Sequence, residues 1–163
     1  MWKKKRYWKW AALALIGLLL FIVEEALPQI FSVPVNLLLP FVLVTAIYEG
    51  PVVGASYGIY CGLLSDIFSS PFGYTALIYL ILGCAAGLVM IYLRQSVTVA
   101  FLFTLVGGLV YFSLTWFLFY YFWYKEGLLY FRIVPLQILY SAIIAVILYP
   151  LSGFVKKRLD KAD

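Results

Sequence analysis

The chain has 163 residues, of which 66% are hydrophobic, 20% aromatic and 12% charged, and its mean hydropathy is +1.03. This composition excludes a soluble globular domain, because such long apolar runs are typical of chains that cross a bilayer. The formal net charge of +5 lies mainly in tails and loops, so it indicates orientation and contact with anionic lipid headgroups, and no nucleic-acid binding is predicted.

Six membrane-spanning helices account for almost the whole chain, since each crossing takes about 20 residues. The first follows a basic, tryptophan-rich collar and ends at the acidic pair Glu24 and Glu25, which favours a retained signal anchor over a cleaved signal peptide. Pro40 is expected to kink the second helix. The predicted spans, within one integral membrane domain covering 1–163, are 10–23, 34–48, 52–67, 71–93, 97–122 and 128–155.

Two of the connections carry clear turn signals. Glu49, Gly50 and Pro51 predict a tight turn between the second and third helices, because proline suits the first position of a helix. Ser70 followed by Pro71 predicts the N-cap and first turn of the fourth helix.

The cations predict the orientation, because positively charged residues concentrate on the cytoplasmic side of a membrane protein. With both termini in the cytoplasm, Lys125 and Arg132 are the two cations that face outward. The other ten face inward: Lys3, Lys4, Lys5, Arg6, Lys9, Arg94, Lys156, Lys157, Arg158 and Lys161. A five-span arrangement with a re-entrant second segment would place the two basic ends on opposite faces, so six spans are favoured.

Glycines recur at every fourth position of the third span and lead to an aspartate. They are Gly50, Gly54, Gly58 and Gly62, followed by Asp66. On a helix these positions share one stripe, and the absence of side chains lets another helix backbone approach closely. The stripe, together with Gly73 at the start of the next helix, predicts either packing within the monomer or an interface with a partner protein.

Asp66 is predicted at the outer end of the third helix, because a carboxylate facing hydrocarbon would be costly. Two environments remain open for it. The carboxylate either is solvated at the level of the lipid headgroups or forms an ion pair with Arg132, which lies at the same depth in the predicted topology.

The sequence lacks the residues that most membrane enzymes need. There is no histidine for hydrolysis or metal binding, and Asp66 is the only aspartate before the C-terminal tail, which excludes an aspartyl dyad. The pair Glu24 and Glu25 lacks the following arginine of prenyl-protease-like enzymes, and no phosphate-binding glycine loop is present. We therefore predict no enzymatic activity, no cofactor and no metal.

Residues 58–73, which read GIYCGLLSDIFSSPFG, resemble the signature segment of the MreD family of rod shape-determining proteins. Length, six spans, the basic N-terminal collar and a last helix with the late proline Pro150 agree as well. The resemblance implies a non-catalytic subunit of the bacterial inner membrane that belongs to the cell-elongation machinery. Its implied direct partner is MreC, with MreB, RodA and a penicillin-binding transpeptidase reached through the complex.

The resemblance also implies a fold similar to the substrate-binding subunits of energy-coupling factor vitamin transporters, and such a subunit is the alternative function. Those subunits dock their energising partner through an Ala-x-x-x-Ala pair on the first helix. Here Ala11, Ala12 and Ala14 are not spaced four residues apart, which counts against the transporter alternative.

Overall fold

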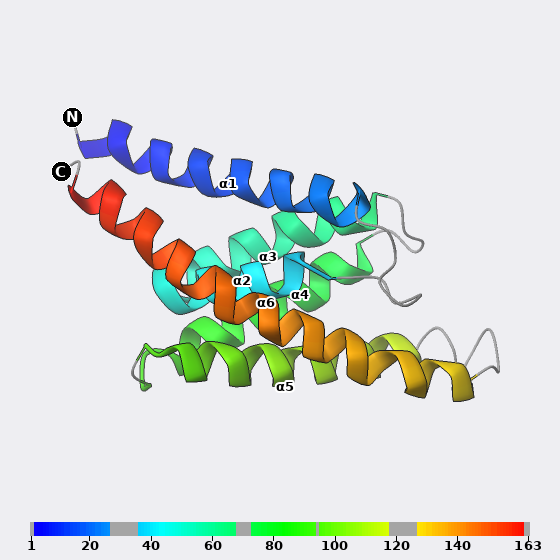
Figure 1. Ribbon diagram of the computed structural model, residues 1–163. Helices are drawn as coiled ribbons and strands as arrows, with labels where there is room; N and C mark the ends of the chain where they lie inside the picture. Colours follow the sequence, from blue (N-terminus) through cyan, green and yellow to red (C-terminus); the bar gives the residue numbers. More distant parts are fainter. Residues whose placement is uncertain (1, 27–35, 68–72, 94, 118–126, 162–163) are drawn as a thin grey trace.

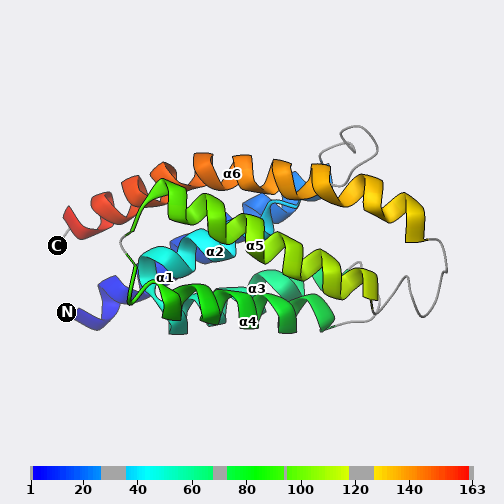
Figure 2. The ribbon, with the colours of Figure 1, turned by 90° about the horizontal axis from the view of Figure 1, so that it is seen from below.

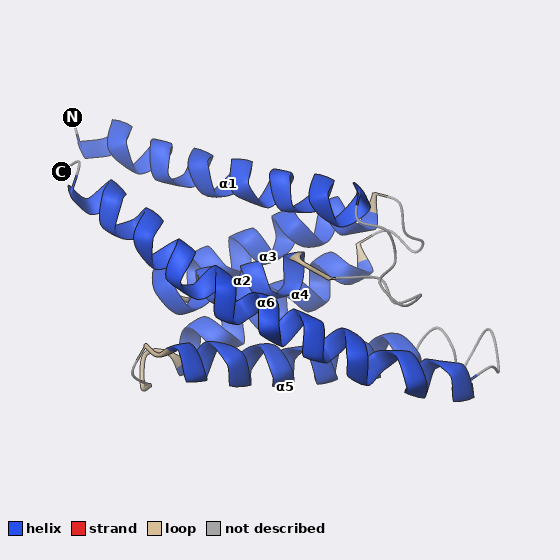
Figure 3. Ribbon diagram, in the orientation of Figure 1, coloured by secondary structure: helices blue, strands red, loops and turns tan. Residues whose placement is uncertain are grey.

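The computed structural model describes residues 2–26, 36–67, 73–93, 95–117 and 127–161, of which the side chains of 2–9, 127–133 and 155–161 are not described. This part of the chain is all-helical, with no strand (Figure 3). Its six helices are α1 (Trp2–Ala26), α2 (Leu38–Glu49), α3 (Pro51–Asp66), α4 (Tyr74–Val89), α5 (Val97–Thr115) and α6 (Gly127–Lys161).

Helix α2 lies at the centre of the bundle and packs against each of the other five helices (Figures 1 and 2). Every residue from Leu38 to Ile47 is buried, as expected for a helix that is apolar on all sides. Pro40 does not lie where it would kink this helix. It is the third residue of α2, in the first turn, where the missing N–H has no intrahelical partner to lose.

Two pairs of helices and the single helix α1 surround α2. Helices α3 and α4 form the most extensive contact, α5 packs on α6, and α1 lies across α3 and α2 (Figure 1). The predicted tight turn is confirmed: α2 ends at Glu49, α3 begins at Pro51, and Gly50 between them has a φ of 92°. Figures 1 and 2 both place the N- and C-terminal ends at the same end of the bundle.

Several helix ends differ from the predicted spans. Helix α1 begins at Trp2, before the apolar run, and α6 continues to Lys161, because lysine and arginine are good helix formers and do not stop a helix. Helix α4 begins at Tyr74, after Gly73 in a left-handed conformation with a φ of 93°, so it does not begin at Pro71. Ser70 and Pro71 themselves lie outside the described residues.

Two described stretches, Val97–Thr115 and Val134–Phe154, are long and apolar enough to cross a membrane, whereas Leu38–Glu49 and Tyr74–Val89 are shorter apolar helices. Large apolar side chains point outward from all the helices around α2, and examples are Leu15, Ile59, Leu77, Val106 and Ile147. The described bundle thus has a buried apolar centre and an apolar exterior, the arrangement that suits a lipid environment.

Candidate functional site

Three glycines of the predicted stripe lie at the contact between α3 and α4: Gly54, Gly58 and Gly62. A Cβ built on Gly54 would lie 2.7 Å from the carbonyl oxygen of Gly83, and one built on Gly58 would overlap the carbonyl group of Tyr79. The approach is reciprocal, because a Cβ on Gly83 would overlap the carbonyl group of Gly54. The two helices therefore meet backbone to backbone, which glycine alone permits.

Asp66, the last residue of α3, caps the start of α4. Its carboxylate accepts hydrogen bonds from the backbone N–H groups of Gly73 at 3.0 Å, Thr75 at 3.3 Å and Ala76 at 3.1 Å. These amides have no partner inside the helix, and a negative charge is favourable at a helix N-terminus. The side chain is only 1% exposed, so the solvated carboxylate considered above is wrong.

The predicted ion pair between Asp66 and Arg132 involves a side chain outside the described residues, and it stays a prediction. Both carboxylate oxygens of Asp66 already accept backbone amides. A pairing with Arg132 would have to add to this cap without replacing it, since an amide left unpaired in a buried place is costly.

A second carboxylate, Glu24 near the end of α1, serves α2 in the same way. Its Oε2 atom accepts hydrogen bonds from the N–H groups of Leu37 at 2.9 Å and Leu38 at 3.1 Å, and Oδ1 of Asn36 accepts the N–H of Leu39 at 2.9 Å. Glu24 follows the apolar run of α1, and burial raises its pKa to about 7, against the opposing effect of the two amide bonds. Both amides bond to Oε2, so the described hydrogen bonds of this carboxylate use one oxygen.

Buried polar side chains connect this region to α4 and α6. The Asn36 side-chain amide donates to the Tyr79 hydroxyl at 2.8 Å, and that hydroxyl donates to Oδ1 of Asn36 at 3.1 Å. The Ser141 hydroxyl donates to the Asn36 carbonyl oxygen at 3.2 Å. The polar atoms thus satisfy one another in the core, which fixes how the three elements meet.

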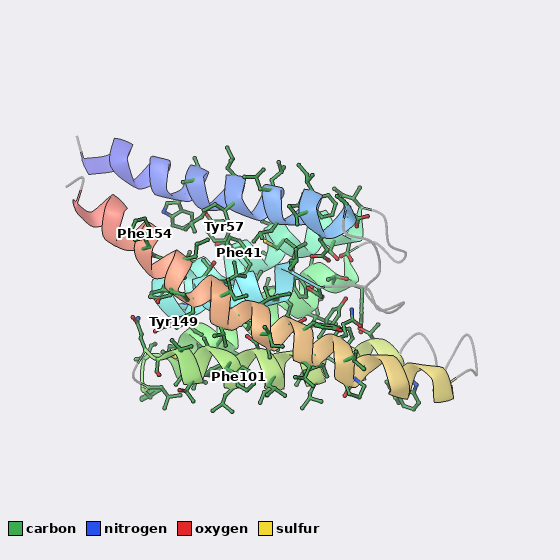
Figure 4. The ribbon with its side chains drawn as sticks, in the orientation of Figure 1. Phe41, Tyr57, Phe101, Tyr149 and Phe154 are labelled. Atoms are coloured by element: carbon green, nitrogen blue, oxygen red, sulfur yellow. The ribbon has the colours of Figure 1, made fainter. Side chains whose placement is uncertain are left out.

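Helix α1 is held to α3 by tyrosine hydroxyls. Tyr57 donates to the carbonyl oxygen of Trp10 at 2.7 Å, and Tyr60 donates to that of Ala14 at 3.2 Å. Figure 4 shows Tyr57 close to α1, and its ring meets that of Phe41 edge to face at 6.5 Å. Side chains therefore make this attachment, in contrast to the backbone contact between α3 and α4.

Comparison with known protein families matches residues 3–157 to MreD, described as rod shape-determining protein MreD. The chain belongs to the MreD family. MreD proteins are non-catalytic, shape-determining membrane proteins, so this chain is a multi-pass protein of the bacterial inner membrane with a role in determining rod shape. No curated protein and no solved structure matches the chain, and the likeness to vitamin-transporter subunits stays a prediction.

The described side chains of this MreD chain include no group of three or more His, Cys, Asp or Glu residues placed to hold a metal ion. The sequence did not predict the hydrogen bonds made by Glu24, Asn36 and Tyr79. Apart from the bond between Asn36 and the Leu39 N–H, their partners are 13 to 105 residues away in the chain, and no local spacing marks such contacts. The one available signal was a carboxylate directly after an apolar run, at the end where the next helix has to begin.

Proposed function

We propose that this MreD protein is a non-catalytic subunit of the bacterial rod complex that binds MreC directly. Through MreC it would be linked to MreB, RodA and the penicillin-binding transpeptidase, and so support peptidoglycan synthesis during elongation. The single observation that carries this proposal is the family match over residues 3–157, nearly the whole chain.

The proposal includes six membrane crossings with both termini in the cytoplasm. It is supported by the position of the two basic ends of the chain, which lie at the same end of the bundle (Figure 1), and by the rule that cations concentrate on the cytoplasmic side. Reporter fusions to the C-terminus that are active on one side of the membrane only would test this orientation.

The MreC surface is proposed to lie on the outward apolar faces, away from the glycine stripe. Gly54, Gly58 and Gly62 are already occupied by contacts to α4 and α2 within the monomer. A partner helix in lipid gains mainly packing contacts, and the exposed apolar residues of α1, α3, α4, α5 and α6 can offer them.

The test is co-purification in mild detergent with the MreC from the same genome, combined with photocrosslinking. A photoreactive residue would replace one exposed position on each outer helix: Leu15, Ile59, Leu77, Val106 and Ile147. Leu43, which is 1% exposed, is the matched buried control. We expect stoichiometric co-elution and crosslinks to MreC from one contiguous face, with none from position 43.

Failure of the wild-type chain to co-elute with MreC would overturn the proposed function. If the same preparation retained a small molecule through purification, the alternative role as a vitamin-transporter subunit would take its place. Crosslinks spread evenly over all five positions would reject a defined MreC surface while leaving the complex itself intact.

A further inference from the structure

The basic ends of the chain come together in the folded protein although they are about 150 residues apart in sequence. Figures 1 and 2 show the start of α1 and the end of α6 at the same end of the bundle. These two helical ends carry nine cations: Lys3, Lys4, Lys5, Arg6, Lys9, Lys156, Lys157, Arg158 and Lys161. Asp160 is the one acidic residue within them, and Glu49 ends α2 nearby, so the local charge is strongly positive.

Both helices extend past the packed part of the bundle as regular helix. On α1, the carbonyl oxygen of Trp10 accepts a hydrogen bond from the Tyr57 hydroxyl, and eight further helical residues precede Trp10. On α6, Gly153 faces the hydroxyl of Tyr48, near the end of α2, and helix continues for eight residues to Lys161. At 1.5 Å per residue each extension reaches roughly 12 Å beyond these contacts. The cations therefore lie on regular helix at one end of the bundle.

The outward apolar stripes of both helices lead directly into the charged positions. On α6, Ile147, Leu151 and Phe154 are more than half exposed and follow a helical spacing of four and three residues. The next position in this register is 158, an arginine. On α1, Leu15 is 61% exposed. The same helical register continues toward the N-terminus through Ala11, Trp8 and Lys4.

We propose that the paired basic ends of α1 and α6 form a binding site for an anionic phospholipid such as phosphatidylglycerol or cardiolipin. The phosphate of the headgroup would be held by lysines and arginines of both helices, and the acyl chains would lie along the outward apolar stripes. Charge complementarity carries the choice of ligand. The direct continuity of charged and lipid-facing positions favours a lipid over an acidic protein segment, which needs no apolar stripe. The headgroup part of this site lies beyond the positions tested for MreC, whereas the acyl chains would share the outward faces of α1 and α6 with Leu15 and Ile147. The lipid measurement uses the chain without MreC, so the two proposals fail separately.

The test is native mass spectrometry of the purified full chain in detergent, with equal amounts of phosphatidylglycerol and phosphatidylcholine that have the same acyl chains. We expect the wild type to retain phosphatidylglycerol preferentially. The variants Lys4→Gln/Lys5→Gln and Lys156→Gln/Lys157→Gln should each lower this preference by roughly fivefold or more, since each cation near a membrane surface contributes about that factor.

Two controls separate the site from bulk charge and from folding. Arg94→Gln/Lys125→Gln removes the same charge outside the two helical ends and should keep the preference. Lys156→Arg/Lys157→Arg keeps the charge in place and should keep the preference too. Absence of a preference in the wild type, an equal loss in the Arg94 and Lys125 control, or an effect from only one of the two ends would overturn the proposal. Binding of polyglutamate in place of phosphatidylglycerol, lost in the same variants, would overturn it in favour of an acidic protein partner.

Discussion

The α3–α4 hairpin and the α1–α2 hairpin are closed by the same device but held in different ways. At the end of each first helix a carboxylate accepts the free amides of the second: Asp66 for α4 and Glu24 for α2. Helices α3 and α4 also meet backbone to backbone through glycines. Helix α1 is attached through the hydroxyls of Tyr57 and Tyr60 and keeps a broad apolar face exposed.

This difference shows why one hairpin leaves a motif in the sequence and the other does not. Backbone contact along a helix requires a glycine at each turn, so α3 carries a regular pattern that ends in Asp66. A side-chain hydrogen bond constrains only a single donor and acceptor, so Tyr57, Tyr60 and Glu24 are not regularly spaced. We expect the α3–α4 hairpin to be the rigid part and α1 the more easily displaced one.

The largest effect is expected from placing a side chain at the α3–α4 contact. Gly58→Leu should prevent stable folding or cost about 3 kcal/mol or more, because its Cβ would overlap the Tyr79 backbone, which cannot move aside. Thermal unfolding in detergent, followed by size exclusion, measures the loss. Gly108→Ala is the control, since the atoms nearest to its Cβ would be those of the Ile138 side chain, at an ordinary 3.4 Å. Equal stability of the two variants would contradict the close contact.

Removal of the α4 cap should have the next largest effect. Asp66→Ala leaves the part-buried amide of Gly73 and the buried amides of Thr75 and Ala76 without their acceptor, and we expect a loss of about 2–3 kcal/mol in unfolding free energy. Asp66→Asn keeps one acceptor oxygen and should lose less, about 1 kcal/mol. The same unfolding assay applies, and an Asp66→Ala protein as stable as Asp66→Asn would show that the cap contributes little.

Exchange of charges separates the cap from the predicted ion pair. The double variant Asp66→Arg/Arg132→Asp should be no more stable than Asp66→Arg alone, because a guanidinium cannot accept the α4 amides. If the exchange restores the folded protein in the unfolding assay, the ion pair between positions 66 and 132 is the principal role of Asp66.

In the α1–α2 hairpin, the Glu24 carboxylate should make the stability of the protein depend on pH. Its pKa is raised from 4.5 to about 7 in the folded chain, so the folded state holds a proton more tightly than the unfolded state. The stabilisation from this proton is present below about pH 4.5 and is lost as the pH rises through 7. Unfolding measured from pH 5 to 8 should therefore show falling stability, by at most about 3 kcal/mol.

Glu24→Gln should flatten this dependence while preserving an oxygen for the amides of Leu37 and Leu38. Glu25→Gln is the matched control, because Glu25 is exposed and its charge is the smallest of the causes that act on the Glu24 pKa, so the profile should shift only slightly. A wild-type stability that rises between pH 5 and 8 would contradict the buried, proton-binding carboxylate.

The smallest effect is expected at the attachment of α1. Tyr57→Phe removes the hydroxyl that donates to the Trp10 carbonyl oxygen and should cost about 1 kcal/mol. Hydrogen exchange should increase in α1 while α3 and α4 stay protected, whereas Tyr92→Phe, at an 89% exposed residue, should change neither. Uniform loss of protection across all helices would show that α1 is as firmly integrated as the rest.

Much of the architecture could be predicted because lipid imposes strong rules on sequence. The apolar runs indicated six helices, and Gly50 and Pro51 indicated the turn between α2 and α3, which the structure confirms. The predictions were wrong for Pro40 and for the start of α4, and of the two environments left open for Asp66 the solvated one is excluded by its burial. Each of these residues lies close to a helix end, and its environment depends on where that helix begins.

By itself the sequence determined the class of protein, the family and the residues that allow two helix backbones to touch. Composition, glycine spacing and turn residues act locally, through the length and period of a helix, and can be recognised without knowing what lies opposite. Only the tertiary structure decided that α2 is the buried centre, that Glu24 and Asp66 cap neighbouring helices, and that the two basic ends lie at the same end of the bundle. These features depend on pairing between distant segments, because a buried polar group is stable only where a partner from elsewhere in the chain satisfies it.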